Sequence, residues 1–371
     1  MYIYYSIDNF LYTITMKKEL TQWSHFLLFS LLIFIWSCGT NSTSNTSSEN
    51  QQNIETPYPT LGNIERLDSA LNEMLAPNAN IEVLAEGFDW SEGPVWVPEH
   101  DFLLFSDIPP NRIYQWKEGD SISLYLTPSG YTGSENLEGE PGSNGLLLDG
   151  EGRLVLCQHG DRRMARMNAP LDNPQPKFIT LVDRYEGKRL NSPNDATYHS
   201  SGDLYFTDPP YGLPQNVDDP AKELDFQGVY KLSADSTLTL LTQELSRPNG
   251  IAFSPDEKTL YVANSDPERA IWMAYDVSAE GTIENERVFY DATALVGQEK
   301  GLPDGLKTDL QGNLFATGPG GVWIFSPEGT VLGKIKTGQA TANCAFNEDY
   351  SVLYITADMY LLRVALHQMP Q

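Results

Sequence analysis

The sequence is poor in cysteine and in basic residues, and both shortages argue against whole classes of protein. Three cysteines in 371 residues are too few for a disulfide framework, and none belongs to the C-x-x-C pair of a zinc or redox site. Lysine and arginine total 24 against 50 acidic residues, which gives a net charge of −26. Nucleic acids and anionic membrane surfaces require a basic face, so this balance argues against both as partners.

Common catalytic motifs are missing as well. The chain contains no G-x-S-x-G nucleophile elbow, no H-E-x-x-H and no P-loop. These absences argue against serine esterases, zincins and nucleotide-binding enzymes. The two internal cysteines, Cys157 and Cys344, are expected to be buried free thiols.

The amino-terminal segment has the layout of an export signal. A basic segment that begins at Met16 precedes an apolar run at residues 26–36, which is too short to span a bilayer. Cys38 follows, and then a stretch rich in Ser, Asn, Thr and Gln. We predict a signal peptide of the lipoprotein type over residues 1–38, with Met16 and not Met1 as the start of translation. A polar tether is predicted over residues 39–60. The alternative is an ordinary signal peptide with an incidental cysteine. In either case we expect the protein in the periplasm or at the cell surface, with Cys38 as the site of a lipid anchor in the first case.

One pattern, a turn followed by a short hydrophobic strand, occurs six times in the rest of the chain. Each strand begins with a leucine and ends in a small or polar residue, and the leucines lie 39–56 residues apart: Leu103, Leu154, Leu204, Leu260, Leu314 and Leu353. A period near this length, built from β-hairpins, is typical of propeller blades. Tandem β-domains are the rival interpretation, but no linker of biased composition separates the units. We predict an all-β fold, a six-bladed β-propeller over residues 80–371. The apolar spacing in residues 61–79 predicts a short helical lead-in.

A second repeat lies ten or eleven residues before each of these leucines. Each unit carries a carboxylate or an amide there, at the start of a strand: Glu92, Asn144, Asn194, Asn249, Asp304 and Asn343. Equivalent positions of propeller blades lie on one ring, so these side chains would meet at one mouth of the channel if the strands are innermost. Oxygen donors without thiolate suit a hard cation such as Ca²⁺. The alternative is that Asn, Asp and Gly simply mark ordinary turns.

Six short motifs lie between residues 92 and 306, and the resemblance they carry extends over about residues 81–365, nearly the whole predicted propeller. They are E-G-P-V-W from Glu92, S-N-G-L from Ser143, N-S-P-N-D from Asn191, Y-F-T-D-P-P-Y-G from Tyr205, R-P-N-G from Arg247 and P-D-G-L from Pro303. With these motifs the sequence resembles the SMP-30/gluconolactonase family of six-bladed propellers, in particular its bacterial gluconolactonase branch.

The resemblance implies a metal-dependent hydrolase that opens a sugar lactone. It implies one divalent cation held by the acids and amides of these motifs, namely Glu92, Asn249 and Asp304. Asn194 is expected as a further ligand or a substrate contact. Three residues are expected to line the substrate pocket: Asn144, His159 and Tyr211. Ca²⁺ is favoured, and Zn²⁺, Mg²⁺ and Mn²⁺ stay open.

Asp304 is our candidate for the general base, because a carboxylate at the metal can accept a proton from the attacking water. The loops at residues 129–143 and 209–227 are long for hairpins and are expected to frame the pocket. Vertebrate members carry an arginine where this chain has Ser192, which leaves the sugar open. Two other functions stay open: a metal-dependent esterase of other substrates, and a non-catalytic propeller that binds a sugar or a protein. The sequence indicates no obligate partner and no oligomeric state.

Overall fold

The computed structural model describes residues 58–368. The predicted signal peptide, the start at Met16, the anchor at Cys38 and nearly all of the tether therefore lie outside the described residues. Within the described part of the chain, no helix has the length and apolar character that a membrane span requires.

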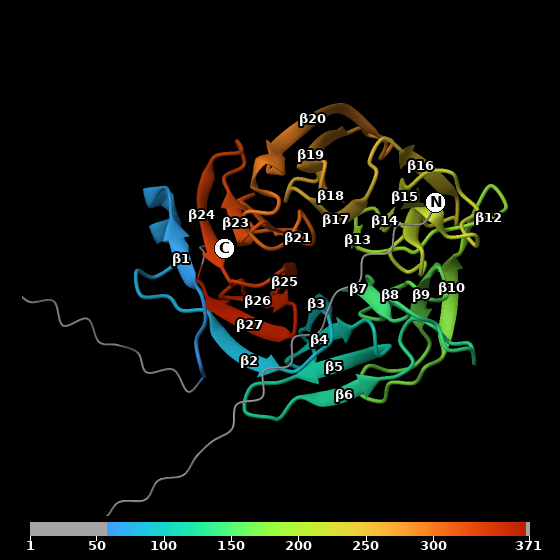
Figure 1. The fold of residues 1–371 in the computed structure, drawn as a ribbon, viewed down its shortest axis with the longest axis horizontal. Helices are drawn as coiled ribbons and strands as arrows, with labels where there is room; N and C mark the ends of the chain where they lie inside the picture. Colours follow the sequence, from blue (N-terminus) through green and yellow to red (C-terminus); the bar gives the residue numbers. More distant parts are fainter. Residues whose placement is uncertain (1–57, 369–371) are drawn as a thin grey trace, which may run out of the picture. The chain divides into compact units, whose positions relative to one another are not determined.

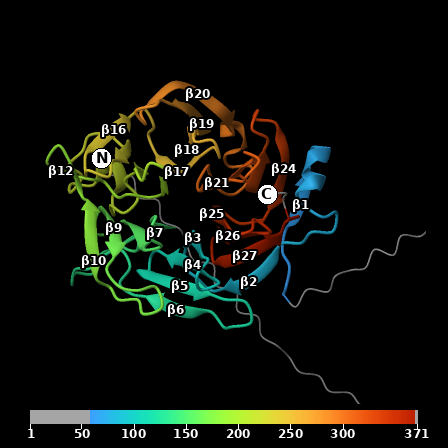
Figure 2. The same cartoon turned by 180° about the vertical axis from the view of Figure 1, so that it is seen from behind.

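Within residues 58–368, six antiparallel sheets of four or five strands stand around a common axis as the blades of a propeller (Figure 1). Blade one contains β3 (Ser91–Val97), β4 (Phe102–Asp107), β5 (Arg112–Trp116) and β6 (Ser123–Leu126). Blade two contains β7 (Ser143–Leu148), β8 (Leu154–Gln158), β9 (Arg163–Met167) and β10 (Phe178–Val182). Blade three contains β13 (Ala196–Tyr198), β14 (Leu204–Asp208), β15 (Gly228–Leu232) and β16 (Leu238–Thr242). The first strand of each blade lies nearest the axis in both views (Figure 2).

The second half of the ring repeats this order. Blade four contains β17 (Pro248–Phe253), β18 (Thr259–Asp266), β19 (Arg269–Val277) and β20 (Ile283–Asp291). Blade five contains β21 (Leu306–Thr308), β22 (Leu314–Gly318), β23 (Gly321–Phe325) and β24 (Val331–Lys336). Blade six contains β25 (Thr341–Phe346), β26 (Val352–Ala357) and β27 (Tyr360–Ala365). A small hairpin of β11 (Arg184–Tyr185) and β12 (Lys188–Arg189) and two short 3₁₀ helices, η2 (Asn216–Asp218) and η3 (Thr293–Leu295), lie in the connections.

The two ends of the propeller are joined within one blade. β2 (Glu82–Glu86) precedes blade one in the sequence but pairs with β27 as the outer strand of blade six. Because this pairing joins the first and last parts of the domain, the ring closes without a seam between separate sheets. Arg363 of β27 reinforces the closure with an ion pair to Glu82 of β2.

The lead-in differs from the predicted helix. Its first half is a strand, β1 (Asn63–Arg66), which pairs with the outer edge of β24. Its second half is one 3₁₀ turn, η1 (Ser69–Glu73), which buries Leu71 against blade five. The sequence pattern could not show the free edge of β24, and hydrogen bonds to that edge favour a strand over a helix.

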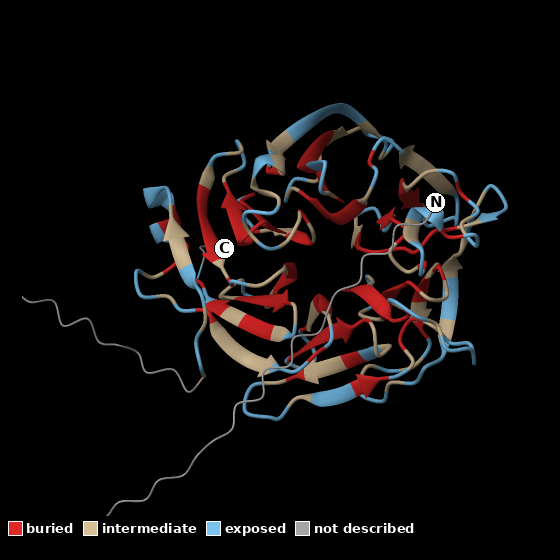
Figure 3. Ribbon diagram, in the orientation of Figure 1, coloured by how far each residue is buried: buried red, intermediate tan, exposed pale blue. Residues whose placement is uncertain are grey.

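The core is divided into six hydrophobic clusters, each shared by two neighbouring blades. All six leading leucines are 0–2% exposed and lie on the second strands of their blades, which confirms the predicted repeat. Cys157 and Cys344 are buried free thiols. The outer strands are the most exposed (Figure 3), and the second strands of the blades are almost entirely buried.

The polar residues that end several second strands have a common role. Hydroxyl groups there donate to a backbone carbonyl of the next blade: Ser106 to Asn144 at 2.8 Å, Thr207 to Asn249 at 2.7 Å and Thr317 to Ala342 at 2.8 Å. These bonds fix adjacent inner strands to each other at the mouth of the channel where the strands begin.

Candidate functional site

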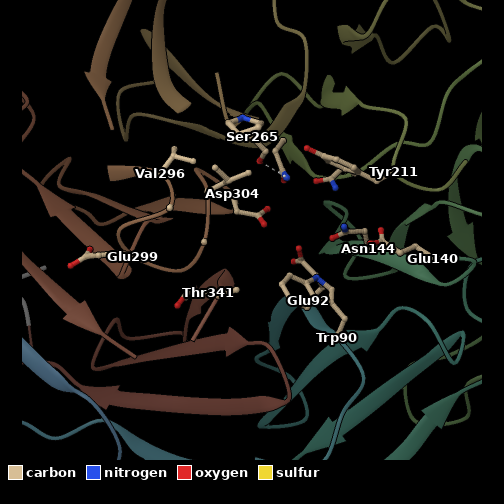
Figure 4. Close-up of a pocket in the computed structure, with 17 residues that line it drawn as sticks. Trp90, Glu92, Glu140, Asn144, Tyr211, Ser265, Val296, Glu299, Asp304 and Thr341 are labelled. Carbon is tan, nitrogen blue, oxygen red and sulfur yellow. Dashed lines mark hydrogen bonds between the residues drawn. The ribbon is translucent and has the colours of Figure 1, made fainter. Parts of the chain in front are cut away.

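A cavity of about 430 Å³ occupies the mouth of the channel where the inner strands begin. Five of the six predicted ring residues line it: Glu92, Asn144, Asn194, Asn249 and Asp304. Figure 4 shows the carboxylates of Glu92 and Asp304 pointing into the centre of the cavity, with Asn144 beside them. Tyr211, predicted as a pocket residue, also lines the wall.

The sixth ring residue, Asn343, does not line this cavity and lies deeper in the channel. Its Oδ1 accepts a hydrogen bond from the Cys344 N–H at 2.8 Å, and its Nδ2 donates to Asp195 at 3.4 Å. Lys307 donates to the same Oδ1 at 3.4 Å. The Asn343 side chain also makes a hydrogen bond to the Glu92 carboxylate, so five of the six predicted residues line the cavity and Asn343 supports one of them.

Glycines behind the ring residues allow the inner strands to approach closely. A Cβ atom on Gly93, which has a φ of +49°, would lie 2.1 Å from the Asn144 carbonyl oxygen. A Cβ atom on Gly250 would lie 2.2 Å from the Asp304 carbonyl oxygen. Any side chain there would push neighbouring blades apart, which gives the physical reason for the glycine in the predicted motifs.

Hydrogen bonds orient the amide of Asn249. Ser265 donates its hydroxyl proton to the Pro303 carbonyl, so its Oγ can only accept a bond from Asn249. The Asn249 Nδ2 donates to that Oγ at 3.0 Å. The Asn249 Oδ1 is left buried with no hydrogen-bond partner among residues 58–368. An oriented oxygen without a partner is what a cation ligand requires.

Glu92 and Asp304 are acids in an environment that opposes their ionisation. Glu92 is 2% exposed, and burial, partly offset by a bond from the Gly93 N–H at 2.9 Å, raises its pKa to about 8. Burial and the nearby charge of Glu92 raise the pKa of Asp304 well above its usual range. Asp304 is partly exposed as a residue, but its Oδ1 is enclosed and has no hydrogen-bond partner in the described structure. A bound cation would offset both the cost of burying the two carboxylates in their ionised form and the repulsion between them.

The charges around the channel match a divalent ion. A third buried carboxylate, Asp195, is 3% exposed and lies 3.7 Å from the Lys307 ammonium group. Lys307 compensates that charge, which leaves Glu92 and Asp304, whose two negative charges equal the charge of a divalent ion, and the more exposed Glu140 at the cavity wall. No group of three His, Cys, Asp or Glu side chains suited to a metal occurs in residues 58–368. The donors here are two carboxylates with amide oxygens, a set that fits a hard cation rather than a thiolate-bound zinc.

The structure places His159 behind the cavity wall. Its side chain is fully buried, and its Nδ1 lies 3.4 Å from the carboxylate of Glu140. Glu140 itself lines the cavity, beyond Asn144 in Figure 4. His159 therefore faces the cavity only through Glu140.

Other lining residues escaped the sequence analysis. They are Trp90, Glu140, Ser265, Glu299 and Thr341, together with most of the segment 296–302. The two loops predicted to frame the pocket contribute Glu140 and Tyr211. The third framing segment follows η3, and the long interval between β20 and β21 was the signal that could have revealed it.

Comparisons with known proteins place the chain in one family. The family model of the SMP-30/gluconolactonase/LRE-like region matches residues 90–358. The gluconolactonase of Zymomonas mobilis is 41% identical over 317 residues, which cover 82% of this chain and 86% of that protein. The lactonohydrolase oryL of Aspergillus oryzae is 27% identical and covers 78% of this chain and 72% of that protein. The solved structure of a gluconolactonase from Xanthomonas campestris superposes with a TM-score of 0.72 at 31% identity, covering 84% of this chain and 98% of that one.

Proposed function

The chain belongs to the SMP-30/gluconolactonase/LRE-like family, and we propose that it is a lactonase that opens a sugar lactone to the aldonic acid with the help of one divalent cation. The observation that carries this proposal is the pair of uncompensated acids, Glu92 and Asp304, in the cavity at the channel mouth. The similarity to the Zymomonas gluconolactonase supports the lactone as the substrate class.

Three oxygen donors would hold the cation: the carboxylates of Glu92 and Asp304 and the free Oδ1 of Asn249. Asn194, on the same cavity wall, would complete the set or contact the substrate. Oxygen-only ligation favours Ca²⁺, and Mg²⁺, Mn²⁺ and Zn²⁺ are the ions to compare with it. A cation bound there would polarise the lactone carbonyl and lower the pKa of a bound water.

The chain's own residues supply the proton transfer and the orientation of the substrate. Asp304 presents an Oδ1 without a hydrogen-bond partner in residues 58–368, so this atom is free to accept the proton of the attacking water. The amide of Asn144 borders the cavity and would bind the substrate's oxygen atoms. Burial raises the pKa of Tyr211, so its phenol stays neutral and can donate a hydrogen bond to the substrate.

We also propose that the enzyme works outside the cytoplasm, anchored through Cys38. The support is the sequence alone: a basic segment, an apolar run, a cysteine and a polar stretch in that order. Cell fractionation tests it, with the wild-type protein expected in the membrane fraction and the Cys38→Ala variant expected outside it. Recovery of the wild-type protein in the cytoplasm would contradict both export and anchoring.

The function itself is tested by the hydrolysis of glucono-δ-lactone and a panel of other lactones, followed by proton release. Metal-stripped protein is compared with protein to which each cation has been restored. The proposal predicts turnover of sugar lactones that depends on the cation. Comparable rates on unrelated aryl esters would indicate a broad esterase instead. Tight cation binding without turnover of any ester would indicate a binding propeller.

A further inference from the structure

Glu140 is a cavity carboxylate that the charge balance of the metal site does not require. It lies in the loop between β6 and β7, borders the cavity, and has a side chain 36% exposed. Among residues 58–368 it makes no ion pair with lysine or arginine, and the Nδ1 atom of His159 lies 3.4 Å from its carboxylate. Glu92 and Asp304 already match the charge of a divalent ion, so Glu140 is not required as a ligand, although its charge contributes to the raised pKa of both acids.

His159 is held in place behind Glu140. Its side chain is 0% exposed, and its backbone N–H donates to the Gly142 carbonyl at 3.2 Å. The backbone of the 209–213 loop packs tightly on it, since a Cβ atom on Gly212 would lie 2.6 Å from the His159 Cβ. Neither ring nitrogen makes a hydrogen bond within the described part of the chain. Buried polar atoms rarely stay without partners, and the Glu140 carboxylate lies 3.4 Å from Nδ1 without forming a hydrogen bond to it.

A carboxylate at this place suits a polyhydroxylated substrate. Its two oxygen atoms accept hydrogen bonds and cannot donate them, so it matches adjacent hydroxyl groups. A sugar lactone carries such hydroxyl groups on the ring, and an unsubstituted lactone carries none. Discrimination by a site built to bind hydroxyl groups is strong, because the wrong substrate leaves a polar group of the site without a partner.

We propose that Glu140 is a specificity residue that accepts hydrogen bonds from the substrate's hydroxyl groups, and that His159 is a positioning residue that fixes its carboxylate. This inference rests on the proposed lactonase function and adds to it the reason why a sugar lactone would be preferred. Substrate binding draws Glu140 and His159 into a full hydrogen bond, as is common for long contacts in unliganded sites.

The test compares two six-membered lactones, glucono-δ-lactone with its hydroxyl groups and δ-valerolactone without them. Glu140→Gln keeps the size of the side chain but replaces one acceptor oxygen and the charge. We expect kcat/KM for glucono-δ-lactone to fall roughly 10- to 100-fold, mainly through KM, because charge-assisted hydrogen bonds are lost. The value for δ-valerolactone should change less than about threefold, since uninvolved surface changes have small effects.

Glu138→Gln is the matched control. Glu138 lies on the same loop, is exposed and does not line the cavity. The control changes the net charge by the same amount, so its selectivity should equal that of the wild type. An equal loss on both lactones in Glu140→Gln, or no loss on either, would overturn the role of Glu140.

The role of His159 is tested by two substitutions. His159→Asn keeps an N–H donor near the position of Nδ1 and should retain the preference for the hydroxylated lactone. His159→Leu removes the donor and should reduce that preference as Glu140→Gln does, with little further loss in the double variant, because the two side chains act as a unit. Additive losses would contradict the positioning role.

The same assays distinguish a failure of this inference from a failure of the proposed lactonase function. Turnover of neither lactone by the wild-type protein would end the lactonase proposal itself. A wild-type enzyme that prefers δ-valerolactone would remain a lactonase but would overturn the inference on hydroxyl recognition.

Discussion

The two mouths of the central channel are built from the same inner strands and enclose cavities of nearly equal size, about 430 and 440 Å³. Their side chains differ in charge compensation. At the mouth where the strands begin, three acids, Glu92, Asp304 and Glu140, make no ion pair with lysine or arginine in the described structure. At the far mouth, aromatic and aliphatic side chains surround Lys307, whose charge is compensated by Asp195.

The two mouths are therefore distinguished by the compensation of their charges and not by the size of their cavities. At the far mouth the buried charge is paired, since Asp195 faces Lys307, and the remaining acid, Glu348, is exposed to solvent. The acidic mouth opposes the ionisation of its acids, and either protonation or a bound cation relieves that unfavourable energy, as is common at functional sites. We expect substitutions of the acids at the acidic mouth to reduce activity, and loss of the paired charge at the far mouth to reduce stability.

The largest expected effect comes from Asp304→Asn at the acidic mouth. Turnover should fall by about 10³-fold, since a general base typically contributes 10²- to 10⁴-fold. The free energy of unfolding of the metal-free protein should not fall, because the change removes a buried acid that lacks a partner. Steady-state kinetics and urea unfolding measure the two quantities.

Tyr350→Phe at the far mouth is the control for this experiment. Tyr350 lines that cavity and should have no influence on turnover. Wild-type turnover in Asp304→Asn would remove Asp304 from the reaction, and the distinction between the mouths would lose its main support.

The reverse pattern is expected for Lys307→Met. The Lys307 ammonium group lies 3.7 Å from Asp195, whose side chain is only 4% exposed. Removing it leaves a buried carboxylate unpaired, so the free energy of unfolding should fall by about 2 kcal/mol, below the range for fully buried pairs because Lys307 is partly exposed. Turnover at saturating cation should stay within about threefold of wild type, as expected for a site outside the chemistry.

Urea unfolding and kinetics at high cation concentration check this second prediction. Unchanged stability with lost turnover would show that Lys307 serves the reaction and not the scaffold.

Cation affinity at the acidic mouth should depend on pH. Burial raises the pKa of Glu92 to about 8 in the metal-free protein. Below pH 8 this carboxyl holds a proton that a cation must displace, so affinity should weaken as pH falls, by up to about tenfold between pH 8 and pH 7 for each proton released. Calorimetric titrations in buffers of different ionisation enthalpy should show proton release at pH 7. Binding without proton release would mean that the site is already ionised.

The smallest expected effect comes from removing one hydrogen bond at each mouth and comparing the two variants. Thr207 donates to the Asn249 carbonyl and Thr308 donates to the Phe253 carbonyl, both at 2.7 Å. Replacing either threonine by valine should lower the free energy of unfolding by about 1 kcal/mol, the usual contribution of one hydrogen bond. Only Thr207→Val should also weaken cation binding, because Asn249 is a proposed ligand. Equal cation affinity in both variants would argue against that ligand.

The sequence predicts the repeated parts of the molecule well, for a physical reason. Each blade must bury the same leucine and present the same residue at the channel, so the requirement recurs along the chain and is visible as a period. The six blades and five members of the ring follow from that recurrence.

Features that occur once were not predictable in this way. Asn343 occupies the expected strand position, but its bonds to Cys344, Asp195 and Glu92 engage its amide within the protein, and it does not line the cavity. The contact between Glu140 and His159 joins two connections whose positions depend on the packing of neighbouring loops. β1 became a strand because β24 offered a free edge, which depends on the assembled blade.

The most direct test of the account is a titration of metal-stripped protein with a single cation, in which bound metal and turnover of glucono-δ-lactone are followed together. The account predicts no turnover in the stripped protein, a rise in proportion to occupancy, and saturation at one cation per chain. Full turnover without the cation, or a bound cation that leaves turnover unchanged, would contradict the claim that the uncompensated acids of one mouth form the catalytic metal centre.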